Sequence, residues 1–330
     1  MDAFEVPEEF ERARIKLVVL PRLVYGRGVS RLFNIVAFAR VLRGARSLSI
    51  VGADVMDGGY GRRPSVLEWS LASAAAKAGI QTRVLGFSWK NDVDRQVQVA
   101  ARRATRSGVV AFARDPHSRA RLQANGVKVE EAADVVFLHS GTSKPNVHDE
   151  RLQGWIEAGK RVAILNMSGL IQATFDQTEE YGLIVEVLRG LGYEILLLPH
   201  VSTDISVIEA FRSSGPTYSN IDYVERLLTP TEVKALVAKA DVVVTGRMHL
   251  SILGLSMGVP SIVLATQGKV LGLMELVGTP RFCVDPVTGF ANIVEIRLRE
   301  LEISRTETVA MINSGVHEAR VLAAVNFRDL

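Results

Sequence analysis

Residues 241–269 read DVVVTGRMHLSILGLSMGVPSIVLATQGK. The valines after Asp241 predict a buried strand that ends at Thr245, and the apolar stretch 250–257 predicts a helix. The Gly-Val-Pro run at 258–260 ends this helix, and a second buried strand is predicted at 261–265. A strand, a helix and a strand in direct succession form the repeating unit of a parallel sheet that helices cover on both faces.

The same alternation extends toward the N-terminus. Further strands are predicted at 48–51, 82–87, 109–113, 134–138, 161–165 and 194–198, with helices between them. Capping boxes are predicted where two of the helices begin, at 65–68 and 229–232. The Gly, Ser, Thr, Lys and Pro residues within 140–145 predict a linker. We therefore expect an α/β protein with two Rossmann-like parallel-sheet domains, residues 1–145 and 146–305, that face each other across a cleft.

Composition excludes several classes of protein. The 330 residues are 48% hydrophobic and 23% charged, which is typical of a globular protein and not of a disordered one. The net charge of +3 comes without a long basic cluster, so we expect no nucleic-acid partner. The chain has one cysteine, Cys283, and no apolar run of bilayer length or signal-peptide pattern. These features favour a cytoplasmic protein without a membrane span.

The candidate ligand site follows from the predicted strands, because ligands of open parallel sheets bind beyond the carboxyl ends of the strands. Arg247 and His249 lie there, where the helix of 250–257 begins. A guanidinium can grip a carboxylate or phosphate through two hydrogen bonds, and the helix N-terminus adds free N–H groups. His249 can move a proton near neutral pH. The same two residues also fit a structural salt bridge, and the sequence leaves both interpretations open.

Other polar residues follow the remaining predicted strands. These candidates for the site are Asp54, Asp57, Arg114, Ser168, His200 and Lys269. Each also has a structural interpretation: Arg114 could pair with the helix-capping Asp115, and Lys269 could be a surface lysine. Metal-binding Cys/His spacing, a Walker motif, a G-x-S-x-G elbow and a G-x-G-x-x-G fingerprint are all missing at the strand ends. We therefore expect no metal and no nicotinamide cofactor.

Taken in order, these segments resemble the polysaccharide pyruvyl transferases. The resemblance rests on 241–269, with its Arg-apolar-His and Gly-Val-Pro, and on shorter pieces in matching order. These pieces are Gly52-Ala-Asp54 with Asp57-Gly58, Gly86-Phe-Ser88, Arg114-Asp-Pro-His-Ser118, Asp134-Val-Val-Phe137, Asn166-Met-Ser168 and Pro199-His200. The family implies two Rossmann-like domains similar to the GT-B glycosyltransferases. In that fold a last helix, here within 306–330, should pack back on the N-terminal domain.

The resemblance also implies a reaction. Family members move a pyruvyl group from phosphoenolpyruvate, their donor substrate, onto two hydroxyls of a sugar and release phosphate. By this analogy His249 and Asp54 are the expected catalytic residues. The expected substrate-binding residues are Arg247, Arg114, Lys269, His200, Ser168 and Asp57. A carboxylate, either Asp54 or Asp57, would share the proton transfers with His249, and both Arg247 and His249 should face the cleft.

One segment departs from the family pattern. Members usually begin with a strand and a Gly-Asn-x-Gly-Asp-like loop, whereas here 16–20 could form a strand that Pro21 follows directly. Either the start is misplaced or this member has lost activity. A GT-B glycosyltransferase that uses a nucleotide sugar also stays open, because an arginine at a helix N-terminus would bind a diphosphate equally well. The expected acceptor is a saccharide or a lipid-linked saccharide. The protein could associate peripherally with a membrane, and it could form a homo-oligomer.

Overall fold

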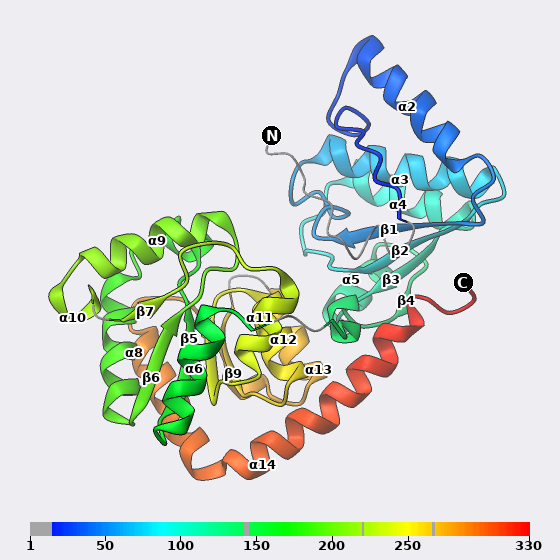
Figure 1. Ribbon diagram of the computed structural model, residues 1–330. Coiled ribbons are helices and arrows are strands. Elements are labelled where there is room, and N and C mark those ends of the chain that lie inside the picture. Colours follow the sequence, from blue (N-terminus) through cyan, green and yellow to red (C-terminus); the bar gives the residue numbers. More distant parts are fainter. Residues whose placement is uncertain (1–14, 142–144, 220, 266–267) are drawn as a thin grey trace.

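The computed structural model describes residues 15–141, 145–219, 221–265 and 268–330. The chain forms two parallel sheets, each with its own helices, which we call the N-domain and the C-domain (Figure 1). The predicted α/β fold with two parallel-sheet domains is confirmed. Part of the predicted linker at 140–145 lies outside the described residues. None of the described helices is long and apolar enough to cross a membrane.

The sheet of the N-domain has four parallel strands in sequential order. They are β1 (Ser47–Ala53), β2 (Gln81–Phe87), β3 (Val110–Ala113) and β4 (Glu130–Glu131). The helices of this domain are α2 (Gly28–Leu42), α3 (Arg62–Lys77), α4 (Arg95–Arg106) and α5 (Pro116–Ala124). Its core contains Trp69, Phe87 and Trp89, which pack edge to face in series and are fully buried.

The sheet of the C-domain has six parallel strands in the order β10-β9-β8-β5-β6-β7. They are β5 (Arg161–Asn166), β6 (Tyr193–Leu197), β7 (Asp222–Tyr223), β8 (Val242–Thr245), β9 (Ser261–Leu264) and β10 (Cys283–Val284). The chain proceeds from β5 to one side and then returns to build the other side from β8. The carboxyl ends of β5 and β8 therefore flank a topological switch point, where ligands of such sheets bind.

The helices of the C-domain connect these strands. They are α6 (Val147–Glu157), α7 (Gly169–Gln172), α8 (Thr178–Gly190), α9 (Ser202–Ser213), α10 (Pro216–Ser219), α11 (Pro230–Val237), α12 (Met248–Ser256) and α13 (Gly268–Leu276). A short 3-10 turn, η2 (Pro280–Phe282), precedes β10. The three valines of β8 are fully buried, as expected for a strand that helices cover on both faces.

The last helix joins the two domains. α14 (Phe290–Val325) begins well before residue 306 and has non-helical backbone angles at Ser304. Its early part is helical because Ala291, Val294, Leu298 and Leu301 bury one face against the C-domain. Its end reaches the sheet of the N-domain, where Asn326 bonds to the backbone of Gly86 and Ala133 (Figure 1).

The predicted strand at 134–138 is wrong, and the possible strand at 16–20 does not form. Residues 135–138 form a 3-10 turn, η1 (Val135–Leu138), because the Asp134 side chain accepts a hydrogen bond from the Val136 amide and closes the turn. A short apolar run does not distinguish a strand from such a buried turn. Residues 16–20 form neither a strand nor a helix, and their side chains are mostly exposed.

Candidate active site

A cavity of about 740 Å³ lies between the two domains. The N-domain contributes the segments after β1 and β2, and the C-domain contributes those after β6, β8 and β9. Six predicted site residues line the cavity: Asp54, Asp57, His200, Arg247, His249 and Lys269. Arg114 and Ser168 lie behind the wall instead of in it. The carboxyl ends of the strands from both sheets therefore meet at one site.

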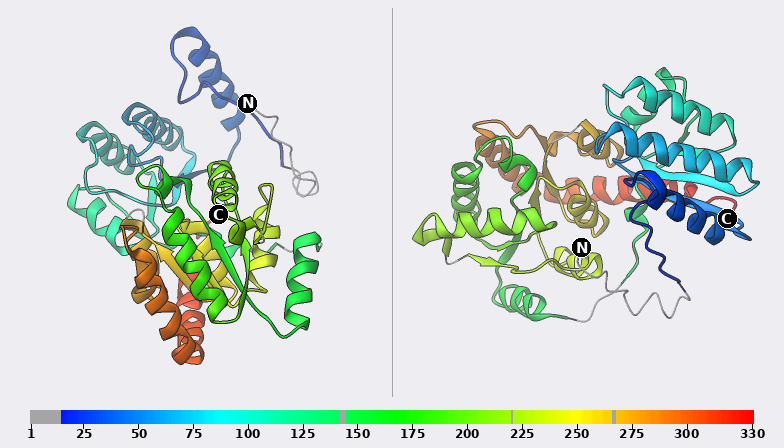
Figure 2. Two further views of the ribbon diagram at one scale, coloured as in Figure 1. Left: turned by 90° about the vertical axis from the view of Figure 1, so that its left-hand side faces the viewer. Right: turned by 90° about the horizontal axis from the view of Figure 1, so that it is seen from above.

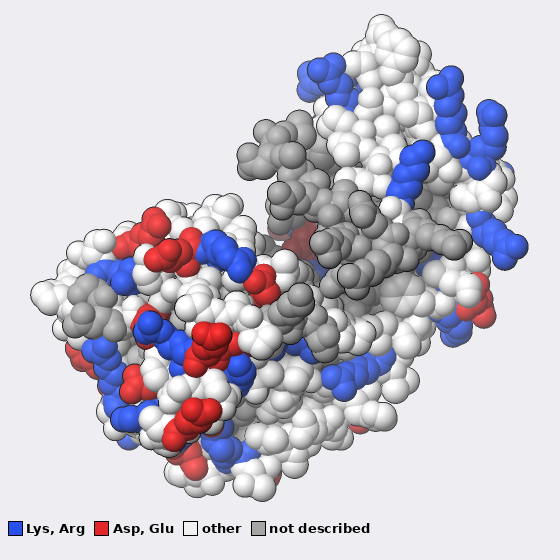
Figure 3. Space-filling view, viewed as in Figure 1, with Lys and Arg blue, Asp and Glu red and all other residues white. Residues whose placement is uncertain are grey.

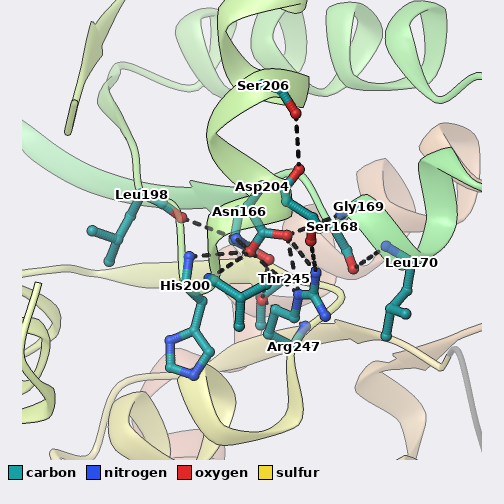
Figure 4. Close-up of polar contacts among 12 residues, drawn as sticks. Asn166, Ser168, Gly169, Leu170, Leu198, His200, Asp204, Ser206, Thr245 and Arg247 are labelled. Atoms are coloured by element: carbon teal, nitrogen blue, oxygen red, sulfur yellow. Dashed lines mark hydrogen bonds and ion pairs between the residues drawn. The ribbon is translucent and has the colours of Figure 1, made fainter. Parts of the chain in front are cut away.

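Arg247 is held at the end of β8 by a buried carboxylate (Figure 4). Its Nε lies 3.2 Å from both oxygens of Asp204, its Nη2 also donates to Asp204, and its backbone N–H donates to Thr245 Oγ1 at 2.9 Å. Among the described residues Nη1 has no hydrogen-bond partner. The guanidinium is therefore fixed on one side and can offer its remaining nitrogen to a ligand in the cavity.

Asp204 organises the polar groups around the switch point. Its side chain is fully buried and accepts hydrogen bonds from Asn166 Nδ2 at 3.0 Å and from the backbone amides of Gly169 and His200 at 2.9 and 3.1 Å. Burial alone would raise the pKa of this carboxyl, but the bonds from Arg247 and these amides keep it lowered. Asp204 is thus an anion that locks the ends of β5, β6 and β8 together.

Ser168 lies beside this network, one residue before Gly169. Its Oγ accepts from the Leu170 amide at 3.2 Å, which caps α7, and the side chain is fully buried. A Cβ on Gly246 would lie 2.8 Å from the Ser168 Cβ, so the two chain segments can approach this closely only with glycine at 246. The structure places Ser168 as a support of the cavity wall, and its binding role stays a prediction.

His200 presents its imidazole to the cavity while its backbone faces Asp204. In Figure 4 the ring points away from the Asp204 carboxylate. Burial, with the nearby His249 and Arg247, lowers the pKa of His200 to about 4. The imidazole is therefore neutral near pH 7 and can exchange hydrogen bonds with a ligand without adding a charge.

A chain of alternating charges connects the two domains on the opposite wall. Arg114, at the end of β3, donates to Ser88 Oγ at 2.8 Å, to Asp134 at 2.8 Å and to Asp54 at 2.5 Å. Lys269, at the start of α13, pairs with the other oxygen of Asp54. Both carboxylate oxygens of Asp54 are thus engaged by cations. Ala53, directly before Asp54, has a left-handed φ of 39°, a strained backbone conformation of the kind that gathers at functional sites.

His249 forms another polar contact between the domains. Its Nε2 lies 3.4 Å from Asp134 Oδ2, and its side chain is 42% exposed. Burial raises the pKa of Asp134, but the hydrogen bond from His249 and the charge of Arg114 outweigh it and hold this pKa well below its usual range. With Nε2 directed at a fixed anion, Nδ1 is left for a ligand. A histidine oriented by a carboxylate in this way is suited to proton transfer.

Burial raises the pKa of Asp57 and lowers the pKa of Lys269, so it shifts both values toward 7. The Asp57 carboxylate accepts from the amides of Gly59 and Lys90 at 2.8 and 3.1 Å, yet burial and the neighbouring Asp54 leave its pKa raised. The pKa of Lys269 is lowered by burial and by Arg114, although Asp54 opposes this. Such opposed shifts in one cavity are typical of acid–base sites.

Several lining residues were missed by sequence reasoning. Lys90 and Arg121 line the cavity, and neither has an ion-pair partner among the described residues. Lys90 lies just three residues past β2, so a longer search beyond each strand end would have found it. Arg121 lies in the middle of α5 and has no such signal. The pairing of Asp134 with His249 and of Asp204 with Arg247 is recognisable only once the chain is folded.

Metal ligation finds no support in the described part of the chain. No group of three or more His, Cys, Asp or Glu side chains there is arranged to hold an ion. The cavity instead combines cations, two aspartates and two histidines, which suits an anionic ligand and proton transfer.

Two parallel α/β domains with a cavity between their strand ends define the GT-B fold, and solved structures agree. A putative UDP-N-acetylglucosamine 2-epimerase from Listeria monocytogenes matches with a TM-score of 0.61 at 12% identity, over 99% of this chain and 87% of that one. The S. aureus MnaA–UDP co-structure matches at 0.60 and 12%, over 98% and 86%. UDP-GlcNAc 2-epimerase from Neisseria meningitidis bound to UDP-GlcNAc matches at 0.60 and 10%, over 96% and 86%. At these identities the likeness concerns the fold alone.

The sequence itself gives the family. The family model described as polysaccharide pyruvyl transferase matches residues 22–268, three quarters of the chain. The protein therefore belongs to the polysaccharide pyruvyl transferase family, and the resemblance noted from its motifs is confirmed. A search of curated proteins found no match.

Proposed function

We propose that this protein transfers a pyruvyl group from phosphoenolpyruvate to two hydroxyls of one sugar in a cell-envelope or exopolysaccharide precursor, forming a cyclic ketal. The observation that carries the proposal is the charge of the cavity. Four basic side chains line it, Lys90, Arg121, Arg247 and Lys269, against two acidic ones, Asp54 and Asp57. Phosphoenolpyruvate brings a carboxylate and a phosphate, and two anionic groups call for more than one cation.

The cations divide into two sets. Lys269 is paired with Asp54 and Arg247 with Asp204, so both are positioned by the protein. Lys90 and Arg121 lack ion pairs among the described residues and have their charge available for the ligand. We therefore assign donor binding to Arg121 and Lys90, helped by the remaining nitrogen of Arg247. A cavity of about 740 Å³ has room for a small donor beside a sugar ring.

The reaction requires a general acid and a general base. The acid gives a proton to the methylene carbon of the donor, while the base takes the proton of the first sugar hydroxyl, whose oxygen bonds to the neighbouring carbon. The second hydroxyl then displaces phosphate from that carbon, and its proton leaves with the phosphate. His249, oriented by Asp134, is our candidate for one of these transfers. Asp57, whose pKa is raised by burial, is better suited to the other than Asp54, because both oxygens of Asp54 are held by cations.

The test is phosphate release by the purified full chain. Phosphoenolpyruvate is supplied with a panel of envelope saccharides, free and lipid-linked, and the product is examined by mass spectrometry for a pyruvyl ketal. We expect one phosphate per ketal, and only with acceptor present. Release of a nucleoside diphosphate from a nucleotide sugar, without phosphate from phosphoenolpyruvate, would make the protein a glycosyltransferase. Donor binding without turnover across the panel would support an inactive family member.

A pair of arginines on one helix gives a matched control for donor binding. Arg121→Ala removes a cavity cation, whereas Arg119→Ala, two residues away, removes an arginine that pairs with Glu131 outside the cavity. A lost hydrogen bond to a charged ligand is worth about 1.5–3 kcal/mol, so KM for phosphoenolpyruvate should rise roughly ten- to a hundredfold in the first variant alone. Equal KM values in the two variants would remove Arg121 from the donor site.

A further inference from the structure

Helix α2 has an unusual relation to the rest of the molecule. None of its 15 residues is buried, and it lies at the outer end of the N-domain (Figures 1 and 2). The hydrogen bonds that hold it run to, or through, the loop at 22–26 directly before it. Asn34 accepts from the Arg22 amide at 3.1 Å, and Arg31 donates to the Leu23 carbonyl at 3.1 Å. Arg63, from the start of α3, donates to the Gly26 carbonyl at 2.6 Å.

The exposed side of α2 is apolar. Val29, Leu32, Phe33 and Val36 follow one another at the i, i+3, i+4, i+7 spacing of a single helix face, and all four are exposed, Phe33 to 70%. Tyr25, just before the helix, is exposed as well. An ordinary surface helix turns such a stripe toward the core. Here the stripe faces outward, and a continuous apolar face of this kind marks an interaction surface.

The described residues before, within and just after α2 carry charges of one sign. Residues 15–53 contain seven basic residues and no acidic one: Lys16, Arg22, Arg27, Arg31, Arg40, Arg43 and Arg46. In Figure 3 the described part of the surface over α2 shows basic side chains and no acidic ones on the visible face. An apolar stripe flanked by arginines is the pattern of a helix that lies in the interface of an anionic membrane.

We propose that the α2 surface, formed by Tyr25, the stripe Val29–Val36 and the flanking arginines, docks the protein on a bilayer that contains anionic phospholipid. The apolar side chains would enter the headgroup region while the arginines meet lipid phosphates. A second copy of the chain is disfavoured as the occupant, because pairing two such surfaces would bring the arginines that flank both stripes together, and residues 15–53 contain no acidic partner for them.

The docking surface is linked to the active-site cavity by a short segment. Asp57, Gly59 and Tyr60 line the cavity, and Arg63, three residues further on, holds the loop before α2. If the proposed function is right, docking through α2 would bring the cavity to a lipid-linked acceptor. The docking itself does not depend on that reaction and is measured without any substrate.

The experiment is co-sedimentation of the full chain with vesicles. One set contains phosphatidylcholine with about 30% phosphatidylglycerol and the other contains phosphatidylcholine alone. We expect binding to the anionic set that weakens as salt is raised. The double variant Leu32→Ser/Phe33→Ser should bind at least about tenfold more weakly, because two large apolar side chains no longer enter the interface. Val287→Ser/Ile303→Ser, which changes two apolar side chains of the C-domain that are at least as exposed as Leu32 and Phe33, respectively, should bind like the unmodified chain.

The two positions of the double variant are exposed, so its melting temperature should not change. No binding to anionic vesicles, or equal binding by the α2 variant and its control, would overturn the proposal. An unmodified chain that is dimeric by light scattering and becomes monomeric in the α2 variant would assign the surface to a second copy instead. Melting temperatures measured for both variants exclude misfolding as the cause of a loss.

Discussion

The proton-transfer role of His249 can be separated from a structural one by a single substitution. His249 is 42% exposed in the cavity and contacts Asp134, so its removal deletes little packing. We expect His249→Ala to lower kcat by on the order of a hundredfold or more, the usual contribution of a positioned proton-transfer group, with an unchanged melting temperature. Both quantities are measured on one purified variant. A lower melting temperature with near-normal activity per folded molecule would indicate a salt bridge that serves only the fold.

His200 should make the stability of the protein depend on pH in a defined window. Its pKa is about 4 in the folded chain against an ordinary 6.5, so between these values the unfolded chain binds a proton that the folded chain does not. The free energy of unfolding should therefore fall as pH drops from 6.5 to 4, by up to about 3 kcal/mol. Above pH 6.5 the contribution is complete and the slope disappears.

Urea unfolding at several pH values, compared between the unmodified chain and His200→Gln, isolates this contribution. The variant should lose most of the slope between pH 6.5 and 4. Burial also lowers the pKa of His148, so a smaller slope should remain, and His148→Gln serves as the control that keeps the His200 share. Parallel stability curves for the unmodified chain and His200→Gln would show that the imidazole is solvated in the folded protein.

How far sequence predicts single residues depends on where they lie relative to the strands. Six of the predicted residues line the cavity because the end of a parallel strand is a position that the chain itself specifies. What Arg114 and Arg247 contact could not be predicted, since their partners Asp134 and Asp204 come from other segments. Arg247 pairs with a buried carboxylate, as its structural interpretation expects, and it also lines the cavity, so its binding role stays a prediction.

At the scale of elements, sequence located the strands better than the helix starts. The capping box at Thr229 and Glu232 is confirmed, with both reciprocal bonds present. The one at Ser65 is wrong: α3 begins at Arg62 after Gly61, and the Ser65 hydroxyl donates to carbonyls of the preceding loop instead. The loop before α3 forms a tight turn around Asp57. The bonds from the Ser65 hydroxyl to this loop took the place of the helix cap that the Ser-x-x-Glu motif predicts.

The contact between α13 and α5 should control the position of Lys269. A Cβ on Gly272 of α13 would lie 2.9 Å from Asp115 Oδ1, and Asp115 caps α5 across the domain boundary. Gly272→Ala should therefore push the two helices apart and cost about 1–3 kcal/mol of stability. Lys269, three residues earlier and one of the four cations that line the cavity, would be moved relative to Asp54, so KM for the anionic donor should rise.

Gly154→Ala is the matched control for Gly272→Ala. Gly154 also lies within a helix, α6, but a Cβ there would meet nothing within 4 Å. This control should leave KM unchanged and raise stability by up to about 1 kcal/mol, because alanine is the better helix former. If Gly272→Ala matched it in both stability and KM, the helix contact would not position Lys269.

At the scale of the whole molecule, the two domains are held together by groups that belong to the site and by the end of the chain. Lys269 with Asp54 and His249 with Asp134 connect the walls of the cavity. Behind them, Arg83 of β2 donates to the carbonyls of Asn326 and Arg328 at 2.9 and 2.8 Å. The return of the last helix to the N-terminal sheet could be anticipated from the family resemblance. The residues that fix it could not, because sequence patterns do not specify contacts between segments this far apart in the chain.

Asn326 should therefore determine whether the two domains unfold together. Its side chain is fully buried, accepts from the Gly86 amide at 2.7 Å and donates to the Ala133 carbonyl at 3.0 Å. Asn326→Ala leaves both backbone groups without these partners, at about 1–3 kcal/mol each. Because Ala133 precedes Asp134, which faces His249, we expect a loss of activity together with an earlier urea transition that separates into two steps.

Arg328→Ala is the control: it removes an exposed ion pair with Glu130 and should change stability by less than about 1 kcal/mol. Coinciding curves for the two variants would mean that the helix, and not this one side chain, carries the connection between the domains.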